Sequence, residues 1–345
     1  MSCAALTHVC RGLLVSFVAV LPAGENVRDL AARQAQQAPE ADAVSVRGSA
    51  GREPAYQQGV SGRADKPNVV LIISDDQGWT DFGFMGHKFI RTPNIDRLAS
   101  AGAVFVNGYV PSSLCRPSLA TLLTGLYPHQ HKICCNDPPS SVNRNVMLQF
   151  IRRQQTVPRL LRKRGYVSLQ TGKFWEGSFS NAGFTHGMTM SGRHGGEGLA
   201  IGRKTMKPIF DFVSRFRDRP FFIWYAPMMP HRPHNPPQRI LSRYAVAGRD
   251  IHLARYWAMC EWFDETCGQL LRCLEANNLQ ERTLVIFVVD NGWIQKTGPA
   301  GGGYAPKSKR SPYDGGVRTP ITVSYTHLRA HETSLHLVCR LLLEK

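Results

Sequence analysis

Three short stretches of the chain are almost wholly apolar and rich in β-branched or aromatic residues. They are "NVVLIIS" (68–74), "PFFIWYA" (220–226) and "TLVIFVVD" (283–290). Strands without polar alternation are typical of parallel sheets, in which both faces are covered. Together with the more polar "YVSLQT" (166–171), these stretches predict a mainly parallel sheet.

Segments with helical patterns separate these strands. In "TPNIDRLASAG", Thr92 is the expected N-cap and Gly102 the expected stop. A short capped helix is expected in "TVPRLLRKRG" (156–165), and apolar residues at helical spacing predict a long amphipathic helix over about 251–277. Because strands and helices alternate, the sequence predicts an α/β domain with helices flanking the sheet.

Reactive or charged side chains follow four of the predicted strands. They are Asp75, Asp76, Lys173, His231, Asp290 and Asn291. Ligands of an open α/β sheet gather beyond the carboxyl ends of its strands, so we expect these side chains to meet at one edge. Three carboxylates there would repel one another unless a cation neutralised them, and oxygen ligands suit calcium before magnesium. The alternative is that "DDQG" and "DNG" are only turns, since both contain favoured turn residues.

A single cysteine stands out in "SSLCRPSLATLLTG" (112–125). The segment reads as a helix that ends at Gly125, with Cys115 at or just before its N-terminus. Backbone N–H groups and the helix dipole favour a charged nucleophile at that position. The alternative is a buried structural thiol, which is the role we expect for Cys260 and Cys267 on one face of the long helix.

The chain is strongly basic, with a net charge of +17. Such a charge favours anionic partners, and no nucleic-acid motif accompanies it, so we expect no nucleic-acid partner. An anionic small molecule or polysaccharide, such as a sulfated or phosphorylated one, fits the charge at least as well, and a merely solvated basic surface is the alternative. Lys173, His231 and Lys309 would stabilise a transferring sulfuryl or phosphoryl group, and His231 or a lysine would protonate the leaving oxygen.

Seven motifs together resemble the sulfatases of the alkaline-phosphatase-like superfamily. They are "NVVLIISDDQG", "TPNIDRLASAG", "CRPSLATLLTGLYPHQH", "TGKFW", "APMMPHRPH", "VVDNG" and "YDGGVRTP", and they extend from about Pro67 to Val323. The resemblance implies an alkaline-phosphatase-like α/β fold with a mainly parallel central sheet flanked by helices. It also implies a smaller C-terminal domain, which we expect to be missing from this chain.

The resemblance further implies a mechanism. In that family a separate maturase oxidises the motif cysteine to formylglycine, and the aldehyde hydrate attacks the sulfur of a sulfate ester. By motif position, Cys115 would be the formylglycine precursor, while Lys173, His231 and Lys309 would bind sulfate and assist the leaving group, with Arg116 beside them. The calcium ligands, with magnesium as the alternative ion, would be Asp75, Asp76, Asp290, Asn291 and the modified Cys115.

Two positions depart from the family pattern. Leu119 stands where the family has an arginine, and the arginine here is Arg116. Trp175, in "GKFW", stands where the family has a histidine that assists the hydrate. Tryptophan cannot accept a proton, so another base would have to serve; His129 and His131 are the candidates, with scaffold roles as the alternative. These departures put modification and turnover in question.

The two ends of the chain lack the pattern of the central part. Residues 12–21 ("GLLVSFVAVL") follow Arg11, are too short to span a bilayer and are typical of a secretory signal, so export to the periplasm or extracellular space is expected. No later segment predicts a membrane span. The expected organisation is a signal peptide (1–24), a disordered linker (25–65), a sulfatase-like catalytic domain (66–323) and a foreign tail (324–345).

The function expected is that of a calcium-dependent sulfuric ester hydrolase acting on a sulfated substrate, with carbohydrate as the expected class. Two alternatives stay open. One is a phosphodiester or phosphonate ester hydrolase of the same superfamily. The other is a binding protein that keeps the anion site but has lost turnover, which Leu119 and Trp175 favour.

Overall fold

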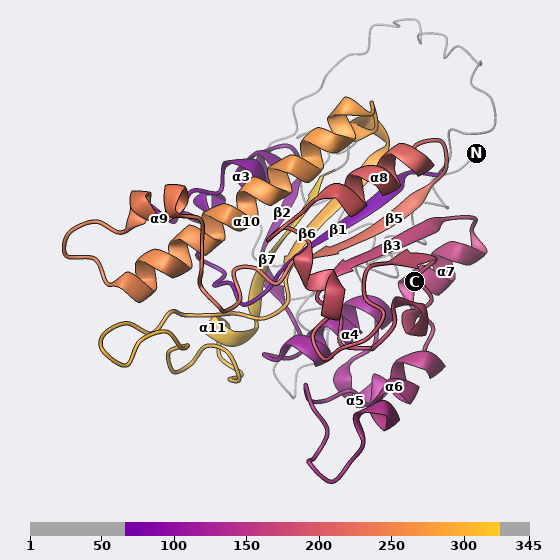
Figure 1. The fold of residues 1–345 in the computed structure, drawn as a ribbon, viewed down its shortest axis with the longest axis horizontal. Helices are drawn as coiled ribbons and strands as arrows, with labels where there is room; N and C mark the ends of the chain where they lie inside the picture. Colours follow the sequence, from indigo (N-terminus) through magenta and orange to yellow (C-terminus); the bar gives the residue numbers. More distant parts are fainter. Residues whose placement is uncertain (1–65, 325–345) are drawn as a thin grey trace, which may run out of the picture. The chain divides into compact units, whose positions relative to one another are not determined.

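The computed structural model of the protein describes residues 66–324, within which one seven-stranded sheet has the order β2-β7-β6-β1-β5-β3-β4 (Figure 1). The strands are β1 (Asn68–Ser74), β2 (Ala103–Tyr109), β3 (Val167–Gly172), β4 (His186–Gly187), β5 (Phe221–Ala226), β6 (Thr283–Val289) and β7 (Arg318–Ser324). β1 pairs in parallel with β5 and β6, and β3 with β4 and β5. β7 runs antiparallel to both of its neighbours, β2 and β6. The predicted mainly parallel α/β sheet is confirmed.

Helices cover both faces of this sheet (Figure 1). On one face lie α3 (Pro93–Ser100), α8 (Lys207–Phe216) and α10 (Ile251–Ala276), with α9 (Gln238–Tyr244) packed on α10. On the other lie α4 (Cys115–Thr124), α5 (Pro128–His131), α6 (Arg144–Arg153) and α7 (Val157–Lys163). The remaining elements are α11 (Asp314–Val317), which precedes β7, and the 3-10 helices η2 (Gly83–Met85), η3 (Phe179–Ala182), η4 (Gly196–Ala200) and η5 (Gln280–Arg282). None of the helices in the described part of the chain is long and apolar enough to cross a membrane.

The central strands are buried on both sides, which explains their lack of polar alternation. In β1, Val70 and Ile72 belong to the core beneath α8 and α10. Their neighbours Val69, Leu71 and Ile73 belong to the core beneath α4 and α7. Each fully buried side chain of this kind contributes about 1.5–3 kcal/mol to folding, so the two faces stabilise the strand together.

The helix boundaries follow the sequence signals. α3 begins directly after Thr92, and α4 ends before Gly125, which adopts a left-handed φ of 71°. α3 ends at Ser100 with Ala101 as its C-cap, so Gly102 stands directly beyond the end of the helix, where a stop residue is expected. A Cβ atom at Gly102 would lie 2.3 Å from the carbonyl oxygen of Val323. The close approach of β7 therefore also requires glycine at this position.

The N-terminus of α3 is capped by the long helix α10 rather than by its own N-cap residue. The Asp264 carboxylate, which is 1% exposed, accepts hydrogen bonds from the backbone N–H groups of Asn94 and Ile95 at 3.2 and 2.8 Å. Its Oδ2 also accepts from Asn94 Nδ2 at 2.7 Å. Asp264 thus satisfies orphan donors of one helix from the middle of another, and it joins α3 to α10.

We expect Asp264→Ala to lower the free energy of unfolding by roughly 2–4 kcal/mol, because it leaves two backbone donors of α3 without a partner in a buried setting. Urea denaturation would measure the loss. Glu265→Ala, at the next position of α10, is the control: its ion pair with Arg239 lies at the surface, so the loss should stay within about 1 kcal/mol. Equal losses in the two variants would contradict the role assigned to Asp264.

Candidate functional site

The carboxyl ends of four neighbouring strands converge on one small volume, as the sequence predicted. In the order of the strands across the sheet, these residues are Asp290 and Asn291 after β6, Asp75 and Asp76 after β1, His231 after β5 and Lys173 after β3. Main-chain bonds hold the strand ends together: Asp75 N–H donates to Met229 O and Asp290 N–H donates to Ser74 O, at 3.0 and 2.9 Å. The parallel register therefore brings together side chains that are far apart in the sequence.

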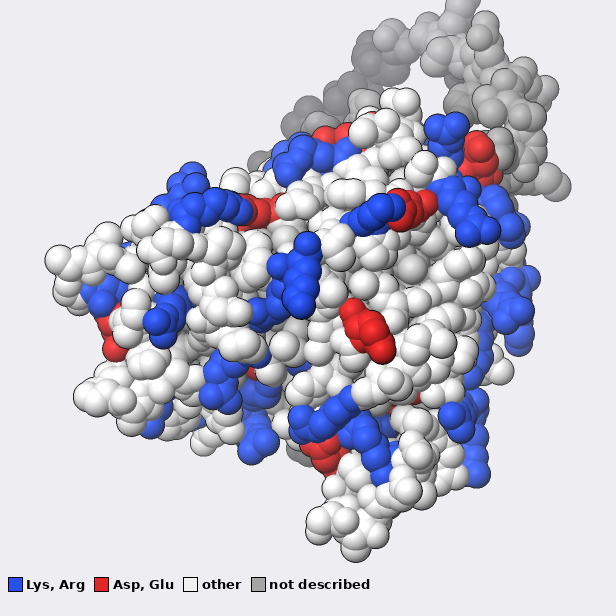
Figure 2. Space-filling view, viewed as in Figure 1, with Lys and Arg blue, Asp and Glu red and all other residues white. Residues whose placement is uncertain are grey.

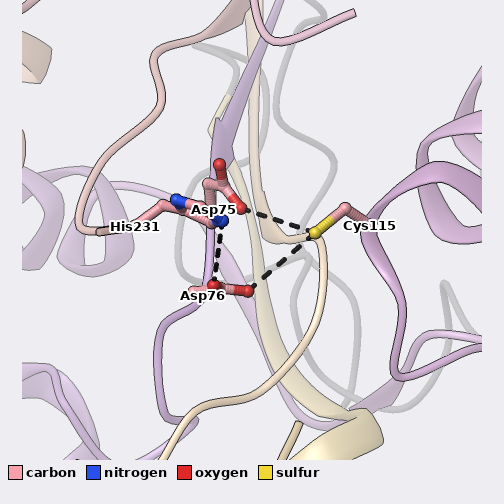
Figure 3. A group of neighbouring side chains, drawn as sticks. All are labelled: Asp75, Asp76, Cys115 and His231. Carbon is pink, nitrogen blue, oxygen red and sulfur yellow. Dashed lines mark hydrogen bonds and ion pairs between the residues drawn. The ribbon is translucent and has the colours of Figure 1, made fainter. Parts of the chain in front are cut away.

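Cys115 is the first residue of α4 and is 1% exposed. Figure 3 shows its side chain extending from α4 toward Asp75 and Asp76, with His231 on the loop opposite. The Sγ atom lies 3.9 Å from Asp75 Oδ1 and 4.0 Å from Asp76 Oδ1. It lies closer still to Nζ of Lys173, at 3.2 Å, and to Nζ of Lys309, at 3.4 Å. Cys115 thus occupies the centre of the cluster.

Ion pairs neutralise two of the carboxylates. Lys173 Nζ lies 2.6 Å from both oxygens of Asp75, and Lys309 Nζ lies 2.5 and 2.6 Å from those of Asp76. His231 Nε2 is 3.4 Å from Asp76 Oδ2. Burial would raise the pKa of Asp76, but Lys309, His231 and Lys173 outweigh it and hold that pKa below its usual range. Burial would lower the pKa of Lys173, yet Asp75 and its neighbours keep that pKa well above the usual value.

The thiol of Cys115 is held neutral by its surroundings. Burial raises the pKa of Cys115 well above its ordinary value, although Lys173 and Lys309 oppose the shift. The thiolate is the nucleophilic form of cysteine. The unmodified sulfur is therefore poorly suited to act as a nucleophile in this arrangement.

Asp290 and Asn291 leave two oxygen atoms without a partner. Asp290 Oδ1 accepts from the Asp76 N–H at 3.2 Å, and Asn291 Nδ2 donates to Asp76 Oδ1 at 2.7 Å. Asp290 Oδ2 and Asn291 Oδ1 are fully buried and have no hydrogen-bond partner within residues 66–324. Burial and the charge of Asp75 raise the pKa of Asp290 well above its usual value. Buried oxygens in this state suit a hard cation, which would bind them and offset the excess negative charge.

The backbone supports the same interpretation. Asp76 has a left-handed φ of 63°, a conformation that is uncommon outside glycine but that aspartate adopts more readily than most residues. Non-glycine residues in this conformation are concentrated at functional sites. Asp75, Asp76, Cys115 and His231 each place one potential ligand atom within 4.8 Å of the others. These groups, together with the two free oxygens, form a candidate metal site.

Arg116, Leu119 and two of the candidate histidines do not reach this cluster. The Arg116 guanidinium is buried and points to Glu176, with Nε–Oε1 and Nη2–Oε2 distances of 2.7 and 2.8 Å. Leu119 belongs to the hydrophobic core beneath α4. His129 stacks on Tyr127, and the buried His131 lies 3.2 Å from Thr121 Oγ1. Arg116 and His131 therefore have scaffold contacts here.

His194 lies beside the cluster, although no sequence motif singled it out. The centre of its ring lies 4.3 Å from the centre of the buried Trp175 ring and 6.1 Å from that of the His231 ring. Its carbonyl oxygen accepts from the Phe174 N–H at 2.8 Å, which ties it to the segment after Lys173. Burial and the charge of Lys173 lower the pKa of His194 to about 4, so its ring is neutral near pH 7. His194 stands 21 positions after Lys173 in the sequence, so no short motif contains both residues.

A second buried carboxylate supports the loop that carries Asp76. Asp81 Oδ2 accepts from the Gly78 N–H at 2.9 Å and from the Tyr256 hydroxyl. Burial raises the pKa of Asp81 to about 6. A cavity of about 380 Å³ lies next to it, with Trp79, Tyr256 and Trp293 among its lining residues. Asp81 thus connects the loop after Asp76 to helix α10.

Comparison with known proteins agrees with this geometry. The family model described as Sulfatase matches residues 67–337. The chain belongs to the sulfatase family. Among curated relatives of this sulfatase-family chain, human N-acetylgalactosamine-6-sulfatase is 29% identical over 326 residues, covering 80% of the chain and 60% of the relative. Human arylsulfatase A is 30% identical over 307 residues, covering 74% of the chain and 58% of the relative.

Solved structures show the same fold. The crystal structure of Ps i-CgsB in complex with k-i-k-neocarrahexaose is 25% identical with a TM-score of 0.61, covering 77% of this chain and 67% of that one. A putative sulfatase from Bacteroides fragilis, at 18% identity, has a TM-score of 0.62 and covers 78% and 70%. The chain spans about 60% of the length of these two curated relatives.

The raised pKa of Asp81 predicts a pH effect on the stability of this sulfatase-family chain. The folded state holds the Asp81 proton to a higher pH than the unfolded state, so the associated stabilisation is complete below about pH 4 and is lost as the pH rises through about 6. In Asp81→Asn that loss is absent. Between pH 4 and pH 7 we expect the free energy of unfolding of the wild type to fall by up to ~3 kcal/mol relative to the variant.

Urea denaturation at several pH values would measure this difference. Asp211→Asn is the matched control, because Asp211 is an exposed carboxylate paired with Lys207 on α8. Its pH dependence should follow that of the wild type. A wild-type curve parallel to that of Asp81→Asn would rule out the raised pKa.

Proposed function

We propose that the chain is a sulfuric ester hydrolase that removes sulfate from a sulfated carbohydrate, with residues 66–323 as its catalytic domain. The observation that supports this most directly is the position of Cys115, within 3.4 Å of two lysine ammonium groups and beside two buried aspartates. A group transferred at this point meets positive charge on its outer oxygens. Membership of the sulfatase family supports the reaction class.

Lys173 and Lys309 would bind the sulfate oxygens and stabilise the negative charge that develops on them. Both ammonium groups are buried beside Cys115 and form ion pairs with Asp75 and Asp76, so their charges already lie where the sulfate oxygens would bind. His231 would assist the leaving group. Its Nδ1 lies 2.6 Å from the carbonyl oxygen of Arg232, to which Nδ1–H donates, so Nε2 is the atom that gains and releases a proton.

Asp75, Asp76, Asp290 and Asn291 would hold a calcium ion, with magnesium as the alternative. The two orphan oxygens of Asp290 and Asn291 support this assignment, since an all-oxygen donor set suits a hard cation. When bound, the cation would neutralise the carboxylates and polarise the sulfate group. His231 and the residue at position 115 complete the surroundings of this site.

Cys115 would reach its active form through conversion to formylglycine by a separate maturase. The neutral, buried thiol is a poor nucleophile, whereas the hydrated aldehyde would supply an oxygen nucleophile at the same point. Leu119 and Trp175 remain the departures that bear on this step. Neither of them contributes a polar contact to the cluster around Cys115.

Two observations support a sulfated carbohydrate as the substrate. The relatives include an N-acetylgalactosamine-6-sulfatase, and the chain carries a net charge of +17. Figure 2 shows lysine and arginine side chains spread over one face of the molecule, with fewer acidic ones among them. The proposal includes export of the protein, directed by a signal peptide at 1–24 that is followed by a linker at 25–65. Both segments lie outside the described residues.

The foreign tail predicted for 324–345 also lies almost wholly outside the described residues. Ser324 is the last residue of β7. The family match extends to residue 337 and so overlaps the first part of this predicted tail.

Coexpression with a formylglycine-generating enzyme tests the assignment of Cys115. Mass spectrometry should find formylglycine at this position, and Cys115→Ala should reduce sulfate release from an aryl sulfate by at least about 10³-fold, since the nucleophile is lost. Cys134→Ala, which removes an exposed cysteine, should keep wild-type activity. Undiminished turnover by an intact thiol would refute the mechanism.

The same assay separates the alternatives. Faster turnover of aryl phosphate or phosphonate esters than of aryl sulfate would favour the phosphoryl reaction. Calcium-dependent binding of a sulfated glycan without turnover, after full conversion of Cys115, would favour a binding protein.

Calcium should stabilise the protein through the orphan oxygens. At a concentration of about 100 Kd we expect the free energy of unfolding to rise by about 2.7 kcal/mol and the Tm by roughly 5–10 °C. Asp290→Asn, which removes one charge at constant shape, should reduce this shift by half or more. An exposed change, Asp211→Asn, should leave it intact. Equal shifts in all three proteins, measured by calorimetry, would place the ion elsewhere.

A further inference from the structure

Two arginines lie over the same buried tryptophan at the edge of the site. The guanidinium carbon of Arg193 is 5.0 Å from the centre of the Trp175 ring, and that of Arg144 is 5.4 Å away. Trp175 is 2% exposed, so its ring is held in place by the core. Guanidinium groups that stack on an aromatic face lose side-chain freedom before any ligand arrives.

One carboxylate serves both arginines. Asp137 Oδ1 accepts from Arg144 Nη1 at 2.8 Å and from Arg193 Nε at 2.7 Å, while its Oδ2 accepts from Arg193 Nη2. His194 is neutral near pH 7, and the Glu176 carboxylate is engaged by Arg116. The group around Trp175 therefore carries one positive charge in excess.

Arg193 is oriented but not saturated. Its hydrogen bonds within the described residues go to Asp137 from Nε and Nη2, and to His194 Nε2 from Nη1 at 2.9 Å. These bonds use three of the five N–H groups of a guanidinium, so two stay available. The Arg193 side chain is 52% exposed, whereas that of Arg144 is 27% exposed. Arg193 is thus the member that a ligand would contact first.

The arginines are tied to the reaction centre through the main chain. Arg144 Nη2 donates to the carbonyl oxygens of Trp175 and Arg193, each at 3.2 Å. The Phe174 N–H donates to His194 O, which places 193–194 beside the residues that follow Lys173. The ring of His194, the residue after Arg193, lies 6.1 Å from that of His231, centre to centre. A substrate whose sulfate lies at Cys115 would extend past this pair.

We propose that Arg193, backed by Arg144 on Trp175, binds a second anionic group of the substrate, a sulfate or a carboxylate on the same saccharide. The proposal rests on the proposed sulfatase function, because the reacting ester is what places the sugar. The Arg193 guanidinium is already oriented and has two N–H donors free within the described residues, and the group around Trp175 carries one positive charge in excess. These properties suit the binding of a planar carboxylate or a sulfate. The site would make the protein selective for saccharides with more than one acidic group.

Binding to the Cys115→Ala protein in the presence of calcium tests the proposal without turnover. The probes are D-glucosamine 2-N,6-O-disulfate, N-acetyl-D-glucosamine 6-O-sulfate and a monosulfated disaccharide that contains a uronate. We expect calorimetry to show at least about tenfold tighter binding of one or both dianionic probes than of the monoanionic one. The probe that shows the preference tells whether the second group is a sulfate or a carboxylate.

Substitutions then assign the preference to Arg193. In the same background, Arg193→Met should reduce the preference about tenfold, and Arg193→Lys, which keeps the charge but loses the fork, should reduce it less. Arg239→Met is the matched control, because Arg239 is an exposed arginine paired with Glu265, and it should not change the preference. Arg193→Lys also covers the case in which Arg193→Met fails to fold.

The two proposals fail in different ways. No preference for a second anion, or a preference that Arg193→Met and Arg193→Lys leave intact, would overturn the subsite. Absence of aryl sulfate turnover by the converted Cys115 protein, with the Arg193-dependent preference retained, would overturn the hydrolase and not the subsite.

Discussion

The Lys173–Asp75 ion pair is the interaction on which the site depends. Both side chains are almost fully buried, at 1% and 2% exposure. An isolated charge in such a place costs several kcal/mol, so each carboxylate needs a cation and each lysine an anion. Lys309 repeats the arrangement with Asp76. Cys115 lies where the two pairs meet, and this position gives it a chemical environment that a lone core cysteine lacks.

The residues that depart from the family pattern build the wall of the site rather than its centre. Arg116 is buried against Glu176 beside the N-terminus of α4. Trp175 supports Arg144 and Arg193 and packs against His194. Leu119 lies in the hydrophobic core and the Arg116 charge is paired with Glu176, so the exposed positive charge beside the site is that of Arg193, which would contact the sugar and not the reacting sulfur. Selectivity and reactivity would then be carried by different elements.

Most of the fold was predictable from local pattern, because burial on both faces leaves the central strands without polar residues. The predicted starts of α3, β1, β6 and α10 agree with the structure. The strand β2, with its partly exposed residues, gave no such signal. Asp264 as the cap of α3 was also missed, because a contact across 169 positions leaves no trace in a local motif. The close approach of Val323 to Gly102, a second requirement for glycine at that position, was missed for the same reason.

The sequence alone determined the strand ends that carry Asp75, Asp76, Lys173 and Asp290, because parallel strands bring their carboxyl ends to one edge whatever the loops do. It also placed Cys115 at a helix N-terminus, which follows from local capping and turn signals. The direction of each side chain, in contrast, depends on the tertiary structure. In the folded chain Arg116 contacts Glu176, and His194 lies beside His231. One oxygen each of Asp290 and Asn291 has no hydrogen-bond partner within the described residues. These outcomes depend on which elements pack together, and packing is a property of the whole chain rather than of any segment.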